Sequence, residues 1–113
     1  MLAKKYRLPV QTAIGKRGRD ARFPDFLIKI FSSPNSYPRF GVVLKKGTVK
    51  KAVDRNRIRR AIFDAIRIRQ KDFNSPGFDF LIIAGSAVLK LSIAELKKEI
   101  NSAFDVIMKQ ISE

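Results

Sequence analysis

The chain has 113 residues, of which 45% are hydrophobic, so it is long enough for one hydrophobic core and too short for two. It contains no cysteine and no histidine, which excludes disulfides, thiolate chemistry, the usual general base and the usual zinc ligand. The formal net charge is +14, and residues 1–60 hold 17 of the 24 lysines and arginines but only three acids. Such a one-sided charge is typical of a surface that binds a polyanion, either a polynucleotide or an anionic membrane.

The sequence contains no segment typical of a membrane span or a secretory signal. Its longest strictly apolar run covers only residues 80–84, and residues 1–20 hold six lysines and arginines without the apolar stretch that a signal peptide needs. We therefore expect an unprocessed cytoplasmic protein with a single domain over residues 1–113.

The first predicted elements are a basic arm and a short helix. Residues 1–8 are expected to form a flexible arm. Pro9 suits the first position of a short helix that carries Val10 and Ile14, and the glycines within residues 15–18 end it.

Residues 26–31 predict a strand, because their apolar positions follow the alternation of a sheet. A turn over residues 32–38, rich in serine, proline and asparagine, makes residues 40–44 the expected antiparallel partner in a hairpin. One face of the first strand carries Phe26, Ile28 and Ile30, and the other carries Leu27, Lys29 and Phe31.

The rest of the chain predicts two helices separated by a strand buried on both faces, residues 78–84. The helix expected over residues 52–71 has an apolar stripe, and the last helix begins with a capping box formed by Ser92 and Glu95. The predicted fold class is α+β, a two-layer sandwich of order α-β-β-α-β-α with room for one further short strand after the first two.

The helix over residues 52–71 carries its charges opposite its apolar stripe, at about 100° per residue. Phe63 and Asp64 lie among these charges, where Phe63 either stacks on a base or covers the edge of the core. The predicted RNA-binding residues are Lys45, Lys46, Lys50, Lys51, Arg55, Asn56, Arg57, Arg59, Arg60 and Arg67.

A solvated helix face is the ordinary interpretation of a charge run. Such a face mixes signs, whereas Asp54 and Asp64 are the only acids within residues 45–71. The composition and spacing therefore favour a nucleic-acid surface. For Asn56, a local contact at the helix N-terminus is the alternative, if the helix begins later than residue 52.

Residues 51–62, which read KAVDRNRIRRAI, resemble the signature of the protein subunit of bacterial ribonuclease P, with its Arg-Asn-Arg core. The resemblance continues in order through residues 39–46, which end in paired lysines, residues 77–84, which begin Gly-Phe-Asp, and residues 91–96, which begin the last helix. It covers about residues 23–111 and is looser before them.

The resemblance implies a small α/β sandwich in which a left-handed crossover carries the Arg-Asn-Arg helix. It also implies a subunit of an endoribonuclease holoenzyme that binds a large catalytic RNA and precursor tRNA while the 5′ leader is removed. The RNA and its magnesium ions would perform the hydrolysis, with no cofactor on the protein alone. The expected assembly is one protein and one RNA, without DNA or membrane. Arg55, Asn56 and Arg57 take the signature's places, and Arg59 and Arg60 its following basic positions.

The family's aromatic contacts to the single-stranded leader are largely replaced in this chain. The matching positions are Val10 and Ile14 in the first helix and Lys29 in the strand, which offers charge and no stacking face. Phe26 and Phe31 are alternatives, although strand aromatics favour the core. The leader-binding cleft predicted from the resemblance comprises Val10, Ile14, Lys29 and Phe31.

Three other functions fit parts of the sequence. A ribosomal or other structured-RNA protein without a processing role has the same composition. A metal-dependent nuclease would draw on Asp20, Asp25, Asp54, Asp64 and Asp79, but Asp54 and Asp64 are roughly 15 Å apart by helical rise. A membrane-surface protein is disfavoured because the basic helix lacks Trp and Leu on its apolar side.

Overall fold

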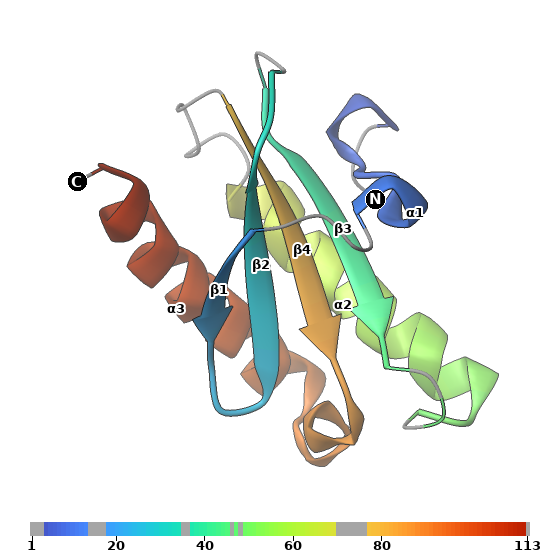
Figure 1. Cartoon of the computed structure of the whole chain (residues 1–113). Helices are drawn as coiled ribbons and strands as arrows, with labels where there is room; N and C mark the ends of the chain where they lie inside the picture. The colour runs from blue at the N-terminus through green and yellow to red at the C-terminus, as the bar shows by residue number, and fades with distance from the viewer. Residues whose placement is uncertain are drawn as a thin grey trace.

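The computed structural model describes residues 4–13, 18–34, 37–45, 47, 49–69 and 77–112. Figure 1 shows a mixed sheet with helices on both of its faces. In chain order the elements are η1 (Lys4–Tyr6), α1 (Val10–Ala13), β1 (Arg19–Arg22), β2 (Phe26–Ser32), β3 (Arg39–Leu44), α2 (Ala52–Arg69), β4 (Phe78–Ala84), η3 (Ser86–Lys90) and α3 (Ile93–Ser112).

The sheet has the order β1-β2-β4-β3, so the predicted hairpin between β2 and β3 is wrong. β4 lies between them, antiparallel to β2 and parallel to β3. The physical reason is that β4 is apolar at nearly every position, and a central strand buries both of its faces. β3 therefore lies at the edge of the sheet opposite β1.

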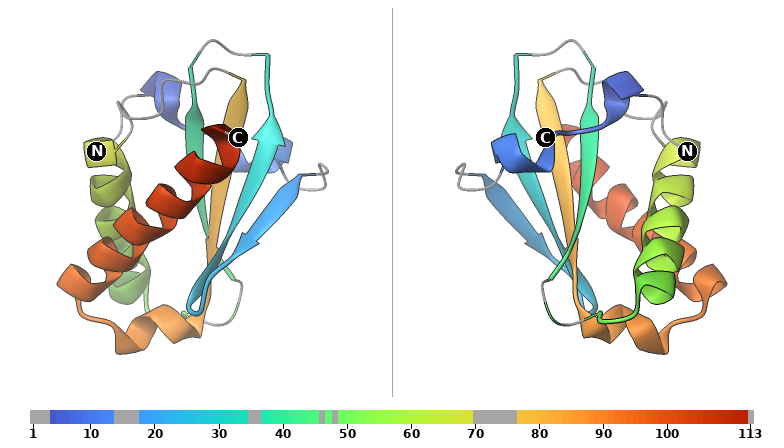
Figure 2. Two further views of the ribbon diagram at one scale, coloured as in Figure 1. Left: turned by 90° about the vertical axis from the view of Figure 1, so that its left-hand side faces the viewer. Right: turned by 90° about the vertical axis from the view of Figure 1, so that its right-hand side faces the viewer.

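The connection from β3 through α2 to β4 is a left-handed crossover, as the resemblance implies. In Figure 1 both strands run downward, β3 lies to the right of β4, and α2 lies behind the sheet. Right-handed connections are the strong rule for parallel strands, so this arrangement is a rare one. α2 and α3 cover one face of the sheet and α1 lies on the other (Figure 2).

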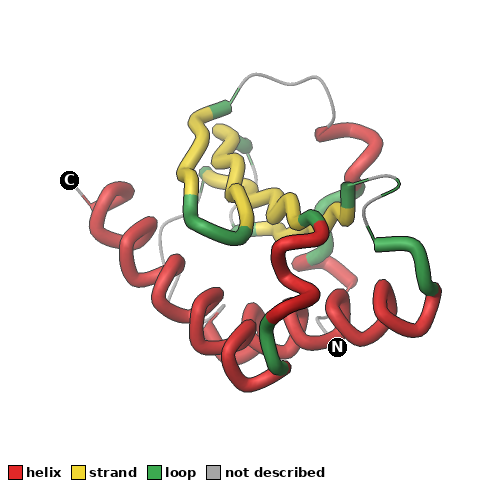
Figure 3. Tube along the Cα trace, turned by 90° about the horizontal axis from the view of Figure 1, so that it is seen from below, coloured by secondary structure: helices red, strands yellow, loops and turns green. Residues whose placement is uncertain are grey.

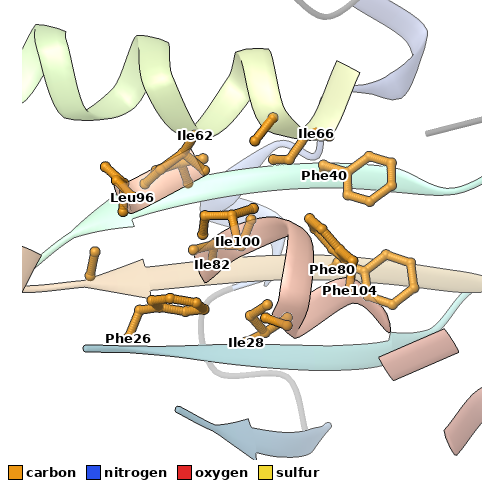
Figure 4. Packing of buried hydrophobic residues seen from close by; sticks show 14 of the residues in the cluster. Phe26, Ile28, Phe40, Ile62, Ile66, Phe80, Ile82, Leu96, Ile100 and Phe104 are labelled. Carbon is orange, nitrogen blue, oxygen red and sulfur yellow. The ribbon is translucent and has the colours of Figure 1, made fainter. Parts of the chain in front are cut away.

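The main core lies between the sheet and the two long helices. Phe40 and Phe80 stack at 5.3 Å between ring centroids, and the Phe104 ring stands at 90° to both. Such aromatic pairs each contribute about 0.5–1.5 kcal/mol beyond the area that they bury. Figure 4 shows how the helices meet the sheet through Ile62, Ile66, Leu96, Ile100 and Phe104 on one side and Phe26, Ile28, Phe40, Phe80 and Ile82 on the other.

The start of α3 confirms the predicted capping box. The Ser92 backbone N–H donates to Glu95 Oε1 at 2.9 Å, and the Glu95 backbone N–H donates to Ser92 Oγ at 3.1 Å. The hydrogen bonds that Ser92 makes to the Glu95 carboxylate, first of all from its backbone N–H, lower the pKa of Glu95 because they stabilise its ionised form. The helix begins where the sequence predicts.

β1 is the further strand, and it lies before β2 rather than after the first two strands. It pairs antiparallel with β2 and buries only Ala21, so it lacks the apolar alternation that marks a strand in sequence. At Gly18, just before β1, a Cβ would lie 2.7 Å from the backbone oxygen of Ile30 and from the Phe31 ring. Only glycine permits this close approach.

The N-terminal arm differs from the prediction from Lys4 onward. The Leu8 backbone N–H donates to the Phe40 oxygen at 2.8 Å, and the Leu8 side chain is buried. Arg7 pairs with Phe40 in an isolated bridge. The buried Leu8 side chain, its backbone hydrogen bond and the Arg7 bridge attach this part of the basic arm to the edge of β3.

Candidate RNA-binding surface

α2 separates an apolar face from a charged one, as its sequence predicts. Ile58, Ala61, Ile62, Ala65 and Ile66 are buried against the sheet and α3. The opposite face exposes Asn56, Arg57, Arg59, Arg60 and Arg67.

The segment before α2 extends this charged face. Lys45, Lys50 and Lys51 are exposed, and Val49 is buried, which anchors the segment to the core. Lys46 lies outside the described residues. We call the seven exposed cations the basic surface: Lys45, Lys50, Lys51, Arg57, Arg59, Arg60 and Arg67.

Arg55 differs from its neighbours because its side chain holds the protein's own backbone. Its Nη1 donates to the Val49 oxygen at 3.1 Å and to the Lys50 oxygen at 2.6 Å. Arg55 therefore fixes the segment that carries the lysines against the first turn of α2. Sequence reasoning predicted an RNA contact here and missed this positioning role, because the role depends on a loop conformation.

Asn56 and Phe63 are the two positions of α2 for which the sequence allows two interpretations. The helix begins at Ala52, so Asn56 lies beyond its first turn and is exposed, which removes the local N-terminal contact as its explanation. Phe63 is buried at 8% exposure and packs in the main core. The interpretation of Phe63 as a base-stacking residue is thus wrong, because α2 packs against α3 as well as the sheet and buries a wider arc than the stripe.

The two long helices differ in net charge. α2 carries six arginines and two aspartates, whereas α3 carries three lysines and three acids. Arg69 is removed from the basic surface, since its Nη2 donates to Asp105 of α3 at 2.6 Å and its side chain is only 13% exposed. The positive potential therefore follows α2 and the lysines that precede it.

A groove opens beside the basic surface, where the N-terminal half of α2 meets the first turn of α3. Arg57 and Arg60 of α2 line it together with Ile93 and Lys97 of α3. Sequence reasoning assigned no binding role to Ile93 or Lys97, because only packing brings them beside α2.

The leader-binding cleft predicted from the resemblance lies on the opposite sheet face, under α1. Phe31 is buried at 3% exposure beside Leu8, Ala13 and Leu81. A ring so covered offers no face to a base, which favours the core interpretation of Phe31. Val10 begins α1, and Ile14 lies outside the described residues.

Lys29 keeps one third of its side chain exposed on this face, with its Nζ 3.9 Å from Asp20 of β1. This long, partly exposed ion pair is weak and leaves the ammonium available to a phosphate. Phe26, on the other face of β2, is buried and stacks on Phe23 at 5.3 Å, so it is core as predicted.

An aromatic cluster at the N-terminus was missed by sequence reasoning. The rings of Tyr6 and Tyr37 meet edge to face at 5.7 Å, and Lys5 Nζ lies 4.9 Å from the first ring and 5.3 Å from the second. Both tyrosines are half-buried. They are 31 residues apart in sequence, so only the fold brings them together.

The carboxylates of the nuclease alternative are spread over the fold and paired with cations. The described part of the chain contains no group of three or more acidic, histidine or cysteine side chains that fits a metal ion. The ion pairs are Arg22–Asp20, Lys29–Asp20, Lys90–Asp25, Arg57–Asp54, Lys97–Asp64 and Arg39–Asp79.

Within the described residues, no helix combines the length and the apolar composition that crossing a membrane requires.

Relatives of this chain carry one consistent name. The family model described as ribonuclease P matches residues 4–108. A ribonuclease P protein component from Idiomarina loihiensis is 34% identical over 88 residues, which are 76% of this chain and 69% of that protein. One from Coxiella burnetii is 39% identical over 74 residues, which are 66% of this chain and 60% of that protein.

Solved structures show the same fold. An RNase P protein from Staphylococcus aureus, a mutant with defective mRNA degradation activity, has a TM-score of 0.80 at 20% identity, covering 93% of this chain and 90% of that one. An RNase P protein from Thermotoga maritima has a TM-score of 0.68 at 23% identity, covering 83% and 90%. At these identities the structures support the fold, and the family follows from the sequence matches. The chain belongs to the family of ribonuclease P protein components.

Proposed function

We propose that this chain is the RNA-binding subunit of a ribonuclease P that helps a catalytic RNA to hold precursor tRNA while the 5′ leader is removed. The observation that carries the proposal is the basic surface, seven exposed cations on α2 and the segment before it, in a member of this family. A surface of one sign, on a rigid helix, suits the phosphates of a folded RNA.

The residues of the basic surface would act by charge-assisted contacts. Arginine presents a planar fork that pairs with two phosphate oxygens, and the exposed Asn56 amide both donates and accepts at a 2′-hydroxyl. Arg55 would position the lysines of the preceding segment through its bonds to Val49 and Lys50. Because the apolar stripe of α2 is buried against the sheet and α3, the helix backbone that carries these groups is held in place.

The chemistry would belong to the RNA. The five aspartates of the nuclease alternative each lie in an ion pair with a lysine or arginine. The magnesium ions of the reaction would be held by the RNA and the precursor. One protein would bind one catalytic RNA. On the opposite sheet face, Lys29 would approach a phosphate of the leader.

The test is reconstitution with the RNA that copurifies with the tagged protein. Its sequencing should yield one discrete large RNA, and the reconstituted complex should cleave precursor tRNA at the 5′ end of the mature sequence. At low magnesium the complex should cleave faster than the RNA alone, and RNA-free protein should cleave nothing. Copurification of ribosomes, or cleavage by homogeneous protein, would contradict the proposal.

A further inference from the structure

The groove beside the basic surface is large enough to hold a small flat ligand. It has a volume of about 500 Å³ and is lined by Val53, Arg57, Arg60 and Asp64 of α2 and by Ile93 and Lys97 of α3. Binding sites for small molecules fall within about 300–1,000 Å³. The two helices that form its walls run side by side under the sheet (Figure 3).

The apolar part of the groove contains an unusually exposed side chain. Val53 is 76% exposed, although it lies in the first turn of a helix whose other apolar residues are mostly buried. Ile93 is half-buried on the facing helix, and the buried Ala61 of α2 also lines the groove. These side chains form an apolar floor on which a flat ligand loses water-exposed surface.

The polar part of the groove matches an anion that also carries hydrogen-bond donors. Arg57 lies 3.7 Å from Asp54, and Lys97 lies 3.8 Å from Asp64, so both ion pairs are long. The side chains of both cations are at least 40% exposed. Such pairs are weak, so both cations remain available to a phosphate. The Asp64 carboxylate, 29% exposed, accepts hydrogen bonds from an amino or hydroxyl group.

We propose that this groove binds one unpaired nucleotide of the RNA, with its phosphate on Arg57, Arg60 and Lys97 and its base on Val53 and Ile93. The inference rests on the proposed function and deepens it. A paired base of an A-form helix is not accessible to side chains from the major groove, whereas an unpaired one can leave the stack and enter a pocket. Because the groove adjoins the basic surface, one RNA can contact both at once.

The experiment compares two labelled RNA hairpins with the same stem, one fully paired and one with a single unpaired uridine. The full-length protein should bind the bulged hairpin roughly tenfold more tightly, since burial of one aliphatic side chain contributes about one tenfold step in affinity. Val53→Ser should abolish that preference and leave binding to the paired hairpin unchanged. Ile68→Ser is the matched control, because Ile68 is also exposed on α2, at 61%, but outside the groove lining.

A second pair of variants tests the phosphate. Lys97→Ala should reduce the bulge preference, whereas Lys98→Ala, its exposed neighbour outside the groove lining, should retain it. Equal affinity of the parent protein for both hairpins, or equal effects of Val53→Ser and Ile68→Ser, would overturn the inference. If the protein also fails to bind its copurified RNA, the proposed function fails as well; intact binding of that RNA without bulge preference removes only the groove.

Discussion

The salt dependence of RNA binding gives the sharpest test of the basic surface. Each phosphate contact adds roughly 0.7–0.9 to the slope of log affinity against log salt. If all seven cations of the basic surface contact phosphates, the slope is about −5 to −6. A fourfold rise in salt, from about 50 to 200 mM, then lowers affinity by roughly a thousandfold or more.

Replacing both Arg59 and Arg60 by alanine removes two of these contacts and leaves the apolar face of α2 untouched. The slope should fall in magnitude by about 1.4–1.8. The free energy of unfolding should change by no more than about 0.5 kcal/mol per substitution, because both side chains are exposed. Fluorescence anisotropy with the copurified RNA over a salt series measures the slope, and thermal melting checks the fold.

The matched control replaces Lys98 and Lys109, two exposed lysines of α3 outside the basic surface. It removes the same charge, so its slope should stay close to that of the parent protein. An unchanged slope in the arginine variant, or an equal loss in the lysine control, would refute the assignment of RNA binding to this face.

Three further predictions concern stability and substrate preference. Arg39→Met removes the guanidinium that donates to both carboxylate oxygens of Asp79, at 2.8 and 3.1 Å, and leaves that carboxylate unpaired at 3% exposure. The free energy of unfolding, measured by urea denaturation, should fall by about 3–5 kcal/mol. A fall below about 1 kcal/mol would contradict a stabilising role for the pair. Lys29→Ala should weaken the preference of the reconstituted complex for precursor over mature tRNA, and equal preference in variant and parent would argue against a leader contact. The pKa of Glu99 is raised by burial and by Asp25, so its ionisation costs stability as pH rises through that raised pKa. Glu99→Gln should therefore raise Tm at pH 7, with a gain that shrinks toward pH 4; a gain independent of pH would exclude this cause.

The role of Asp79 follows from its partner in the sheet and not from its place in the sequence motif. The sequence places Asp79 at the start of a strand and leaves its role open between metal ligand and structure. In the sheet, Arg39 and Asp79 are direct partners across the parallel pair β3 and β4. The aspartate also raises the pKa of the Arg39 guanidinium by accepting its hydrogen bonds. The carboxylate is therefore occupied by an ion pair that holds the crossover strands in register.

Local signals in the sequence were sufficient for the elements that carry the basic surface. The Ser92 and Glu95 capping box, the apolar stripe of α2 and the alternation in β2 each depend on residues within a few positions of one another, and all three are confirmed. The exposed side of α2 followed from the same periodicity, because a helix that buries one face leaves the other in water.

Tertiary packing decided what those signals leave open. β4 pairs with β2 and β3, which lie far from it in the sequence. β1 buries only one residue, so its sequence lacks the apolar alternation that predicts a strand, and it forms by pairing with β2. Phe63 is buried because α3 meets α2 beside the sheet, and the same meeting places Lys97 and Ile93 in the groove. Period and spacing describe one helix at a time, whereas burial depends on every element that packs against it.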